Sequence, residues 1–294
     1  MEGVGLDSIG IFTNNGSALI TANVVSWGQG SNSATGIFNS GSTPRIVGNT
    51  IGGTPGLPNA SYGIYNNAAN AVILRNSIDG GLGCVAVTGI DNEAGSIAQI
   101  YDNIIHAGVG QSGDSVISTG IWNVSSSATI QCNTIDIGNP GTGSTTAGSV
   151  AIGVTVSTCS PVIDDNIVFS DHGIIFNQTQ YGIVEQGASS SPNELRNNDI
   201  YNCPDALYVQ STTANLTAIS AVNSLPGSGN NVSTNPSFKQ MTWTAAGWTT
   251  TDWHLTSSTP AAVTQGGETL SGTDLGVDRD GIARTVPWSI GAYQ

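Results

Sequence analysis

The sequence predicts an all-β protein built as a parallel β-helix of stacked coils. Three observations support this fold class. An asparagine recurs eight times at intervals of 25 to 33 residues, an aliphatic residue stands two positions after each, and a Gly-Ile or Gly-Val pair begins 13 residues before it in five repeats. The frame Ile-x-x-Asn-x-Ile is too short for a helical repeat, and its period is that of one solenoid coil. The continuous repeat favours one elongated domain over two compact ones.

The recurring asparagine predicts a corner between two short strands. Such a corner needs backbone near the left-handed region, which Asn tolerates better than other non-glycine residues. Stacked coils place successive asparagines about 4.8 Å apart, so their amides can hydrogen-bond along the stack. The predicted ladder consists of Asn23, Asn49, Asn76, Asn103, Asn133, Asn166, Asn198 and Asn223.

The residues around each asparagine predict a columnar core. Three positions before the Asn stands Ile or Leu in seven repeats, with Ser220 as the exception. The segment from the Gly-Ile pair to the Asn is nearly constant, so insertions fall on one edge of the coils and are longest at 107–119 and 136–152. The pattern stops after Leu225. We therefore predict a β-helix over 1–225 and a C-terminal cap over 226–294 that closes the last coil.

Composition excludes several classes of partner. The formal net charge is −14 and the only lysine is Lys239, so the chain lacks the basic surface that nucleic acids and anionic membranes require. The sequence contains no apolar stretch of about 18 residues, so it predicts no membrane-spanning helix. The four cysteines have no metal-ligand spacing and no two share a column, so we predict small buried residues without disulfides. No amphipathic segment covers the first coil, and we expect the natural protein to extend before Met1.

The tail resembles a known family. Its motifs are Gly229 to Phe238, Asp252-Trp253-His254-Leu255, Asp278-Arg279-Asp280-Gly281 and Ile290-Gly291-Ala292-Tyr293. In order and spacing they resemble β-helix proteins that end in a "choice-of-anchor Q" domain. The resemblance implies a right-handed single-stranded parallel β-helix of about eight coils with an irregular C-terminal cap, in a secreted or cell-surface bacterial protein. Activity is not uniform in this family, so the resemblance implies architecture and location but no reaction.

One column of side chains is a candidate catalytic site. The third position after the ladder Asn carries Asp79, His106 and Asp136 in three successive coils. If the strand continues past the inward aliphatic, this position faces outward and the three side chains stand about 4.8 Å apart. Such a trio can act as acid and base on a glycosidic bond or hold a metal ion. The alternative is a solvated column of charges that contributes little.

Further candidates are weaker. Arg75 and Asp102 each precede a ladder Asn and could join the same surface, and Trp27, Trp122 and Tyr201 could stack on sugar rings. Asp164-Asp165 followed by Asp171-His172-Gly173 faintly resembles β-helix polygalacturonases, without their other strands. Asp278-x-Asp280-Gly281 contains a fragment of a calcium loop, for which a tight turn is the better interpretation. We expect no required cofactor, with calcium as an option.

Two classes of function follow. The first is an extracellular, non-catalytic module that binds polysaccharide or cell-surface glycan, or serves as a rigid structural unit that can self-associate through the ends of the β-helix. The second is a polysaccharide lyase or glycoside hydrolase that uses the Asp79, His106 and Asp136 face. The negative charge disfavours uronate polymers, so neutral glycans fit better.

Overall fold

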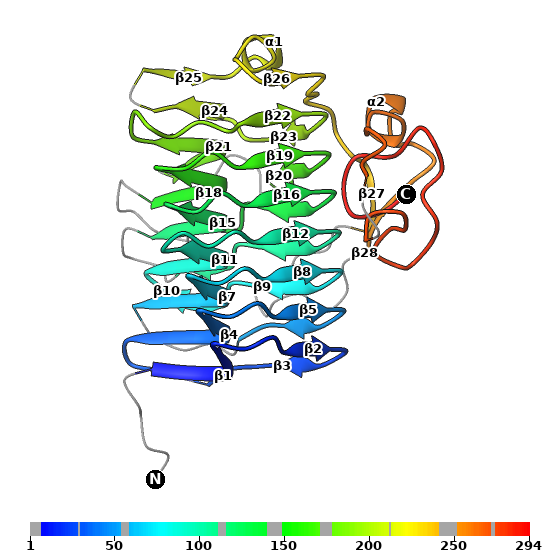
Figure 1. Cartoon of the computed structure of the whole chain (residues 1–294). Coiled ribbons are helices and arrows are strands. Elements are labelled where there is room, and N and C mark those ends of the chain that lie inside the picture. Colours follow the sequence, from blue (N-terminus) through cyan, green and yellow to red (C-terminus); the bar gives the residue numbers. More distant parts are fainter. Residues whose placement is uncertain are drawn as a thin grey trace.

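The computed structural model is an all-β parallel β-solenoid, as predicted (Figure 1). Three long sheets run the length of the stack, and nearly all neighbouring strands are parallel. The structure describes residues 7–28, 30–53, 59–110, 116–139, 149–170, 178–211, 213–240, 252–271 and 274–294.

Sheet A forms the widest wall and has nine strands. Eight follow one another in chain order and in parallel, and the ninth, β25, pairs antiparallel with β24. The strands are β1 (Asp7–Asn14), β4 (Ser33–Ser40), β7 (Ala60–Asn67), β11 (Ala86–Glu93), β15 (Ile117–Val124), β18 (Ser149–Ser157), β21 (Gln178–Gln186), β24 (Ala206–Gln210) and β25 (Ala214–Leu216).

Sheets B and C meet at the asparagine corner. Sheet B consists of β2 (Leu19–Thr21), β5 (Arg45–Val47), β8 (Val72–Leu74), β12 (Gln99–Tyr101), β16 (Thr129–Gln131), β19 (Val162–Asp164), β22 (Glu194–Arg196) and β26 (Ser228–Gly229). Sheet C consists of β3 (Val24–Val25), β6 (Thr50–Ile51), β9 (Ser77–Asp79), β13 (Ile104–His106), β17 (Thr134–Asp136), β20 (Ile167–Phe169) and β23 (Asp199–Tyr201).

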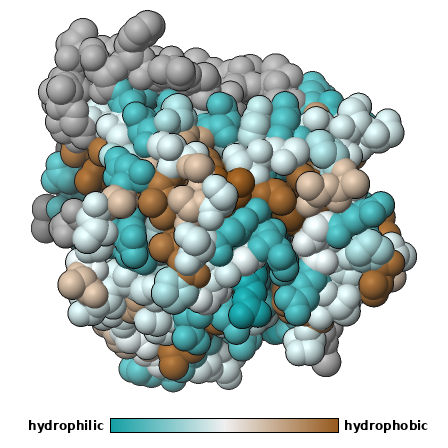
Figure 2. All heavy atoms as spheres, turned by 90° about the horizontal axis from the view of Figure 1, so that it is seen from above, coloured by the Kyte–Doolittle hydropathy of each residue, from teal (hydrophilic) through white to brown (hydrophobic). Residues whose placement is uncertain are grey.

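The solenoid has seven complete coils and a partial eighth. Sheet C contributes one strand to each of the seven, and the eighth has β24 and β26. Helix α1 (Ile219–Val222) covers this end, with Val222 fully buried. Figure 2 views this end from above and shows polar and apolar side chains mixed on it. The remaining described elements are β10 (Leu82–Cys84), β14 (Val109–Gly110), β27 (Phe238–Gln240), β28 (Asp252–Leu255) and α2 (Ala261–Thr264).

The asparagine ladder is confirmed, with one correction at its end. Asn103 shows the pattern: its Oδ1 accepts from the backbone N–H and Nδ2 of Asn76, and its Nδ2 donates to Asn133 Oδ1 at 3.0 Å. The eighth position belongs to Asn231, which bonds Asn198, and not to Asn223. Asn223 lies at the end of α1 and bonds Asn231 from above, so it terminates the ladder.

The expected reason for asparagine at this corner is wrong. The left-handed residue is the one before each ladder Asn, for example Arg75 with φ 56° and Asp102 with φ 53°. The ladder asparagines themselves are absent from the described positive-φ residues. Asparagine is therefore required for its side chain, which bonds the coils above and below and satisfies buried backbone groups that would otherwise be costly.

The core is a set of aliphatic columns, as predicted. Ile46, Ile73, Ile100 and Ile130 pair in register through sheet B, and each is fully buried. Three of the four cysteines, Cys132, Cys159 and Cys203, are free and buried, as expected, and nothing is described for the side chain of Cys84.

The Gly-Ile landmark marks a bend of sheet A where backbones approach closely. A Cβ on Gly89 would lie 2.6 Å from the carbonyl oxygen of Gly120 and 2.6 Å from Ile105 Cγ2. Three residues after several of these glycines stands an inward asparagine, which forms a second ladder in addition to the predicted one. Its members, linked in order by Nδ2 to Oδ1 bonds of 2.7 to 2.9 Å, are Asn39, Asn66, Asn92 and Asn123.

The C-terminal tail packs along the flank of the solenoid, where a cap over the last coil was expected. In Figure 1 β27, β28 and α2 lie beside the stack. The tail bonds successive coils: Asp274 contacts Arg45 of β5, and Gly291 N donates to the carbonyl of Asp165 at 2.7 Å, four coils further along. Tail residues Ile290 and Ala292 are fully buried against Ile104 and Ile167.

Candidate functional site

The predicted trio Asp79, His106 and Asp136 forms a column, but it is enclosed. Strands β9, β13 and β17 hold the three residues in register. His106 Nδ1 lies 3.4 Å from Asp79 Oδ1, and its Nε2 lies 3.4 Å from Asp136 Oδ2. His106 is 3% exposed and Asp136 is 1% exposed. The column faces away from the core, because Ile78, Ile105 and Ile135 before its members point inward. It is not open to solvent as expected, and its catalytic role stays a prediction.

The two aspartates of this column also have structural partners. Asp79 Oδ1 accepts from the backbone N–H of Gly81 at 2.8 Å, and Asp136 Oδ1 accepts from that of Gly138 at 3.2 Å. Both glycines have positive φ, so each carboxylate fixes the turn that follows its strand. Much of the two insertions expected to wall a groove here, 111–115 and 140–148, lies outside the described residues.

Arg75 and Asp102 do not line an open surface, because the tail covers them. Asp102 Oδ1 accepts from Arg284 Nη2 at 2.7 Å, and both side chains are fully buried. Arg75 Nη2 donates to the carbonyl of Asp274 at 2.9 Å. Burial raises the pKa of Asp102 to about 7, although the charge and hydrogen bond of Arg284 act in the opposite direction. These residues anchor the tail rather than present a sugar site.

Trp27 and Tyr201 differ from the expected exposed platforms. Trp27 is 3% exposed and belongs to the main core, where its ring fills the space left by Gly36 and Gly53. Tyr201 is half-buried and packs against the aromatic cluster that joins Phe169 to the tail. It also lines a hollow of about 350 Å³ together with Phe238 and polar residues, so a contact with ligand there stays a prediction.

A column of aromatic rings, exposed at its first member and half-buried at the others, lies on the outer face of sheet A. Phe12, Phe38 and Tyr65 stand in register on β1, β4 and β7, with ring centroids 5.2 and 5.0 Å apart, and Tyr62 stacks on Tyr65 at 5.2 Å. Phe12 is 55% exposed. Trp122 on β15 continues the same column two coils beyond Tyr65. We call these five residues the outer aromatic column.

The sequence contains a signal for this column that lies outside the asparagine frame. Its members other than Tyr62 stand two positions after the repeated glycine, in Gly-Ile-Phe, Gly-Ile-Tyr and Gly-Ile-Trp. Because side chains alternate along a strand, the residue after the buried Ile faces outward. Equal offsets in successive coils then place the rings above one another. Of the aromatic residues selected from the sequence, only Trp122 belongs to it.

Two carboxyl groups interrupt the outer aromatic column. Asp91 occupies the column position on β11 between Tyr65 and Trp122, and Glu93 is the next outward residue of that strand. Tyr65 Oη donates to Glu93 Oε2 at 2.6 Å. Asp91 is 5% exposed, and its Oδ1 has no hydrogen-bond partner among the described residues. Burial, and to a smaller extent the charge of Glu93, raises the pKa of Asp91 to about 8.

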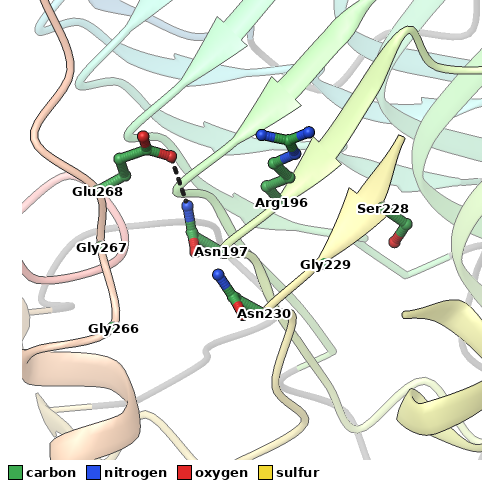
Figure 3. A pocket seen from close by; sticks show the side chains of 8 residues that line it. All are labelled: Arg196, Asn197, Ser228, Gly229, Asn230, Gly266, Gly267 and Glu268. Carbon is green, nitrogen blue, oxygen red and sulfur yellow. Dashed lines mark hydrogen bonds between the residues drawn. The ribbon is translucent and has the colours of Figure 1, made fainter. Parts of the chain in front are cut away.

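A polar groove lies between the solenoid and the tail. It has a volume of about 570 Å³ and is lined on one side by Arg196, Asn197 and Asn230 and on the other by Gly267 and Glu268, among others. Figure 3 shows the bond from Asn197 Nδ2 to Glu268 Oε2, 3.2 Å long, that closes one side. Arg196 is exposed and extends from β22. The lining contains no aromatic ring, so it offers hydrogen bonds but no stacking surface.

The remaining acidic motifs have structural explanations. Asp165 is fully buried, and its two carboxylate oxygens accept from the backbone N–H of Glu268 at 3.0 and 3.1 Å. The segment Asp171-His172-Gly173 lies outside the described residues. Asp278 Oδ1 accepts from the N–H groups of Asp280 and Ile282, which makes a tight turn. No group of three His, Cys, Asp or Glu suited to a metal ion occurs in the described ranges.

The tail motifs converge on one cluster. His254 Nε2 lies 2.7 Å from Asp280 Oδ2, and the imidazole packs on the ring of Tyr293 at 4.1 Å. Asp252 bonds the other nitrogen of His254. Partial burial lowers the pKa of His254, but the two carboxylates outweigh it and the pKa is raised. The motifs thus hold the tail's own fold together, which accounts for their spacing.

Comparisons with known proteins add little. No family model matches the chain, and no curated protein matches it. A solved structure that resembles it is a trypsin-treated form of QnrB1, a plasmid-mediated fluoroquinolone resistance protein, at 11% identity over 70% of this chain and 94% of that chain, with a TM-score of 0.17. A likeness this weak carries no argument about function. The two described helices, each of four residues, are far too short to cross a membrane.

Proposed function

We propose that this protein is an extracellular, cell-surface β-solenoid module that binds a neutral polysaccharide along the outer aromatic column of sheet A. The observation that carries the proposal is the run of rings from Phe12 through Phe38 to Tyr65, spaced 5.2 and 5.0 Å apart on the outer face of consecutive strands. Exposed aromatic rings of this kind provide large apolar surfaces with a polar edge.

The geometry suits a linear ligand better than a compact one. The solenoid repeats its outer positions once per coil, about 4.8 Å apart, so one sugar ring can meet one coil. A polysaccharide laid along the axis would meet an aromatic ring in the first three coils and again at Trp122. The charge of −14 supports a neutral glycan over a polyuronate, because a like-charged polymer would be repelled.

The location and the family remain part of this proposal. The tail motifs resemble a choice-of-anchor Q domain, and this resemblance supports a bacterial secreted or cell-surface location. A low content of charged residues, a rigid ladder of buried amides and a core of buried aliphatic columns fit a display or spacer role as well. Calcium is not required by the proposed contacts, which use rings and hydroxyl groups.

The test is retention on insoluble neutral polysaccharides. We expect the unchanged protein to sediment with the polymer and the Phe38→Ala/Tyr65→Ala variant to stay in solution. The matched control is Tyr201→Ala, which removes a half-buried aromatic ring from sheet C and should leave retention unchanged. Equal retention of all three proteins would contradict binding on sheet A, and loss in the Tyr201 variant alone would move the site to the hollow beside the tail.

A second role, assembly through the first coil, is favoured by a separate observation. Strands β1, β2 and β3 are edge strands of their sheets among the described residues, and each contains an exposed aliphatic residue, namely Ile9, Leu19 and Val24. Open parallel edges template further strands. Analytical ultracentrifugation of the unchanged protein tests this role: a concentration-dependent rise in mass supports it, and a monomer at all concentrations excludes it. The enzyme hypothesis on the Asp79, His106 and Asp136 face is tested by product release from a His106→Ala variant.

A further inference from the structure

We propose that Asp91 and Glu93, on the outer face of β11, form an acid and base pair that hydrolyses a glycosidic bond of a neutral polysaccharide bound on the outer aromatic column. This inference rests on the proposed function, because the same column supplies the substrate contacts. It is an alternative to the Asp79, His106 and Asp136 column as the catalytic candidate.

The two carboxyl groups lie on the same outer face of one strand. Asn92 between the two residues points inward and belongs to the second ladder, so Asp91 and Glu93 both face outward. Two residues of a strand span about 6.6 Å along the backbone, so the two carboxyl groups stand on adjacent outward positions. Asp91 lies in the aromatic column itself, so a polymer lying on the column would pass over Asp91 with Glu93 to one side.

The two carboxyl groups differ in their surroundings. Asp91 is almost fully buried beside aromatic side chains, and its raised pKa of about 8 keeps a proton on it at neutral pH. Glu93 is half-buried and accepts the phenolic hydrogen of Tyr65. Burial and the bond to Glu93 raise the pKa of Tyr65, so the phenol stays a donor. When the surroundings of two carboxyl groups push their pKa values apart, one can act as the general acid and the other as the general base.

Unused polar atoms continue along the same column. Trp122 Nε1 is buried without a hydrogen-bond partner among the described residues, and so is the hydroxyl of Thr155, its neighbour in register on β18. Buried polar atoms are nearly always bonded in proteins. Trp122 is the register neighbour of Asp91 and Thr155 lies one coil further. These unused polar atoms favour a ligand with hydroxyl groups along this column, and this observation is independent of the carboxyl pair.

The reaction balances with water as the only co-reactant. Asp91 donates its proton to the glycosidic oxygen as the bond from that oxygen to the anomeric carbon breaks. Glu93 takes a proton from water as the water oxygen bonds to the anomeric carbon. The products are two shorter glycans, one with a new hemiacetal. Proton exchange with solvent then restores Asp91 and Glu93.

The experiment measures new reducing ends and retention together, on a panel of neutral polysaccharides at pH 6. We expect the unchanged protein to release product, and Asp91→Asn and Glu93→Gln each to lower the rate by about 100-fold or more, the usual scale for general acid and base groups. Retention should be unchanged in both variants. The control Asp205→Asn alters a carboxyl group at the start of β24, near Gln180 N, and should keep full activity.

The outcomes separate the two proposals. Retention without product from the unchanged protein overturns hydrolysis and leaves binding intact. Product release that survives in both variants moves catalysis away from β11. Absence of both retention and product overturns the binding proposal as well. Activity should also fall about tenfold per pH unit above pH 8 as Asp91 loses its proton in the field of Glu93, Tyr62 and Tyr65, and a rate that stays constant to pH 10 would exclude Asp91 as the acid.

Discussion

Replacing Arg284 by methionine tests whether its guanidinium compensates the negative charge of the buried Asp102 carboxylate. Arg284 Nη2 donates to Asp102 Oδ1 at 2.7 Å and to the carbonyl of Gly291 at 3.0 Å. Methionine keeps much of the side-chain volume but leaves the carboxyl group of Asp102 without its cation. Loss of the bond to the carbonyl should cost about 1–3 kcal/mol at any pH.

The Asp102 carboxyl group also makes the free energy of unfolding depend on pH, and the direction of this dependence follows from the pKa of Asp102. The pKa of folded Asp102, about 7, lies above its ordinary value of 3.8. The contribution of this group to stability is therefore highest below about pH 4 and falls as pH rises to 7, where the carboxyl group ionises beside Arg284. In the variant only the weaker field of Arg75 still favours ionisation, so the pKa of Asp102 rises further and the loss continues above pH 7. Two further pH units correspond to about 2.7 kcal/mol at about 1.36 kcal/mol each.

Urea unfolding at pH 5 and pH 9 measures both parts. The guanidinium of Arg284 lies 5.4 Å from the ring centroid of Trp288, so tryptophan fluorescence reports on this contact. We expect a loss of about 1–3 kcal/mol at pH 5 and a loss larger by up to about 2.7 kcal/mol at pH 9. The double variant Arg284→Met/Asp102→Asn should lose the pH dependence. Equal losses at both pH values in the single variant would refute the argument that Arg284 compensates a buried charge.

Three further predictions concern the solenoid itself. Asn103→Ala should lower the free energy of unfolding by about 3 kcal/mol or more, because it leaves several buried polar groups without partners at about 1–3 kcal/mol each. Asn23→Ala, at the exposed end of the ladder, should cost less than about 1 kcal/mol. Equal urea midpoints for the two variants would contradict a stabilising ladder. Gly89→Ala should cost about 1–3 kcal/mol by overpacking, while Gly229→Ala, where a Cβ meets nothing within 4 Å, should be neutral in the same assay. Burial raises the pKa of Asp165 to about 8, so the folded state holds protons that the unfolded state releases, and thermal scans should show a melting temperature that falls from pH 5 to pH 8; a rise would show that other groups dominate.

The repeat could be predicted from the sequence because each coil is fixed by local spacing. Ladder, core columns and register all follow from residues at equal offsets. The exception is the eighth ladder position, because Asn223 and Asn231 stand 25 and 33 residues after Asn198 and both intervals fit the repeat. There the chain inserts α1 before returning to the ladder. The left-handed position could not be assigned, since side-chain identity at Arg75 and Asp102 gives no sign of positive φ.

The candidate site was predicted less well. Register placed Asp79, His106 and Asp136 together correctly, but burial depends on segments distant in sequence, which periodicity does not reveal. The tail's position along the flank depends on contacts such as that of Arg284 with Asp102, which are 182 residues apart. In the sequence, the outer aromatic column corresponds to the residue after each Gly-Ile pair. It was missed because positions were counted from the ladder asparagine, and this count reaches only the residues next to the asparagine corner.

The tail that runs along the flank changes how the stack should respond to force. In a plain solenoid each coil touches only its neighbours, so an end coil can peel away alone. Here a single strap is bonded to β5 through Arg45 and Asp274 and to the corner before β23 through Asn197 and Glu268. Tension along the axis would load the strap and the coils between these two bonds in parallel, and those coils could separate only after the strap detaches. They should therefore yield together in one large step, while the first coil, which lies before the bond to β5, can still separate alone.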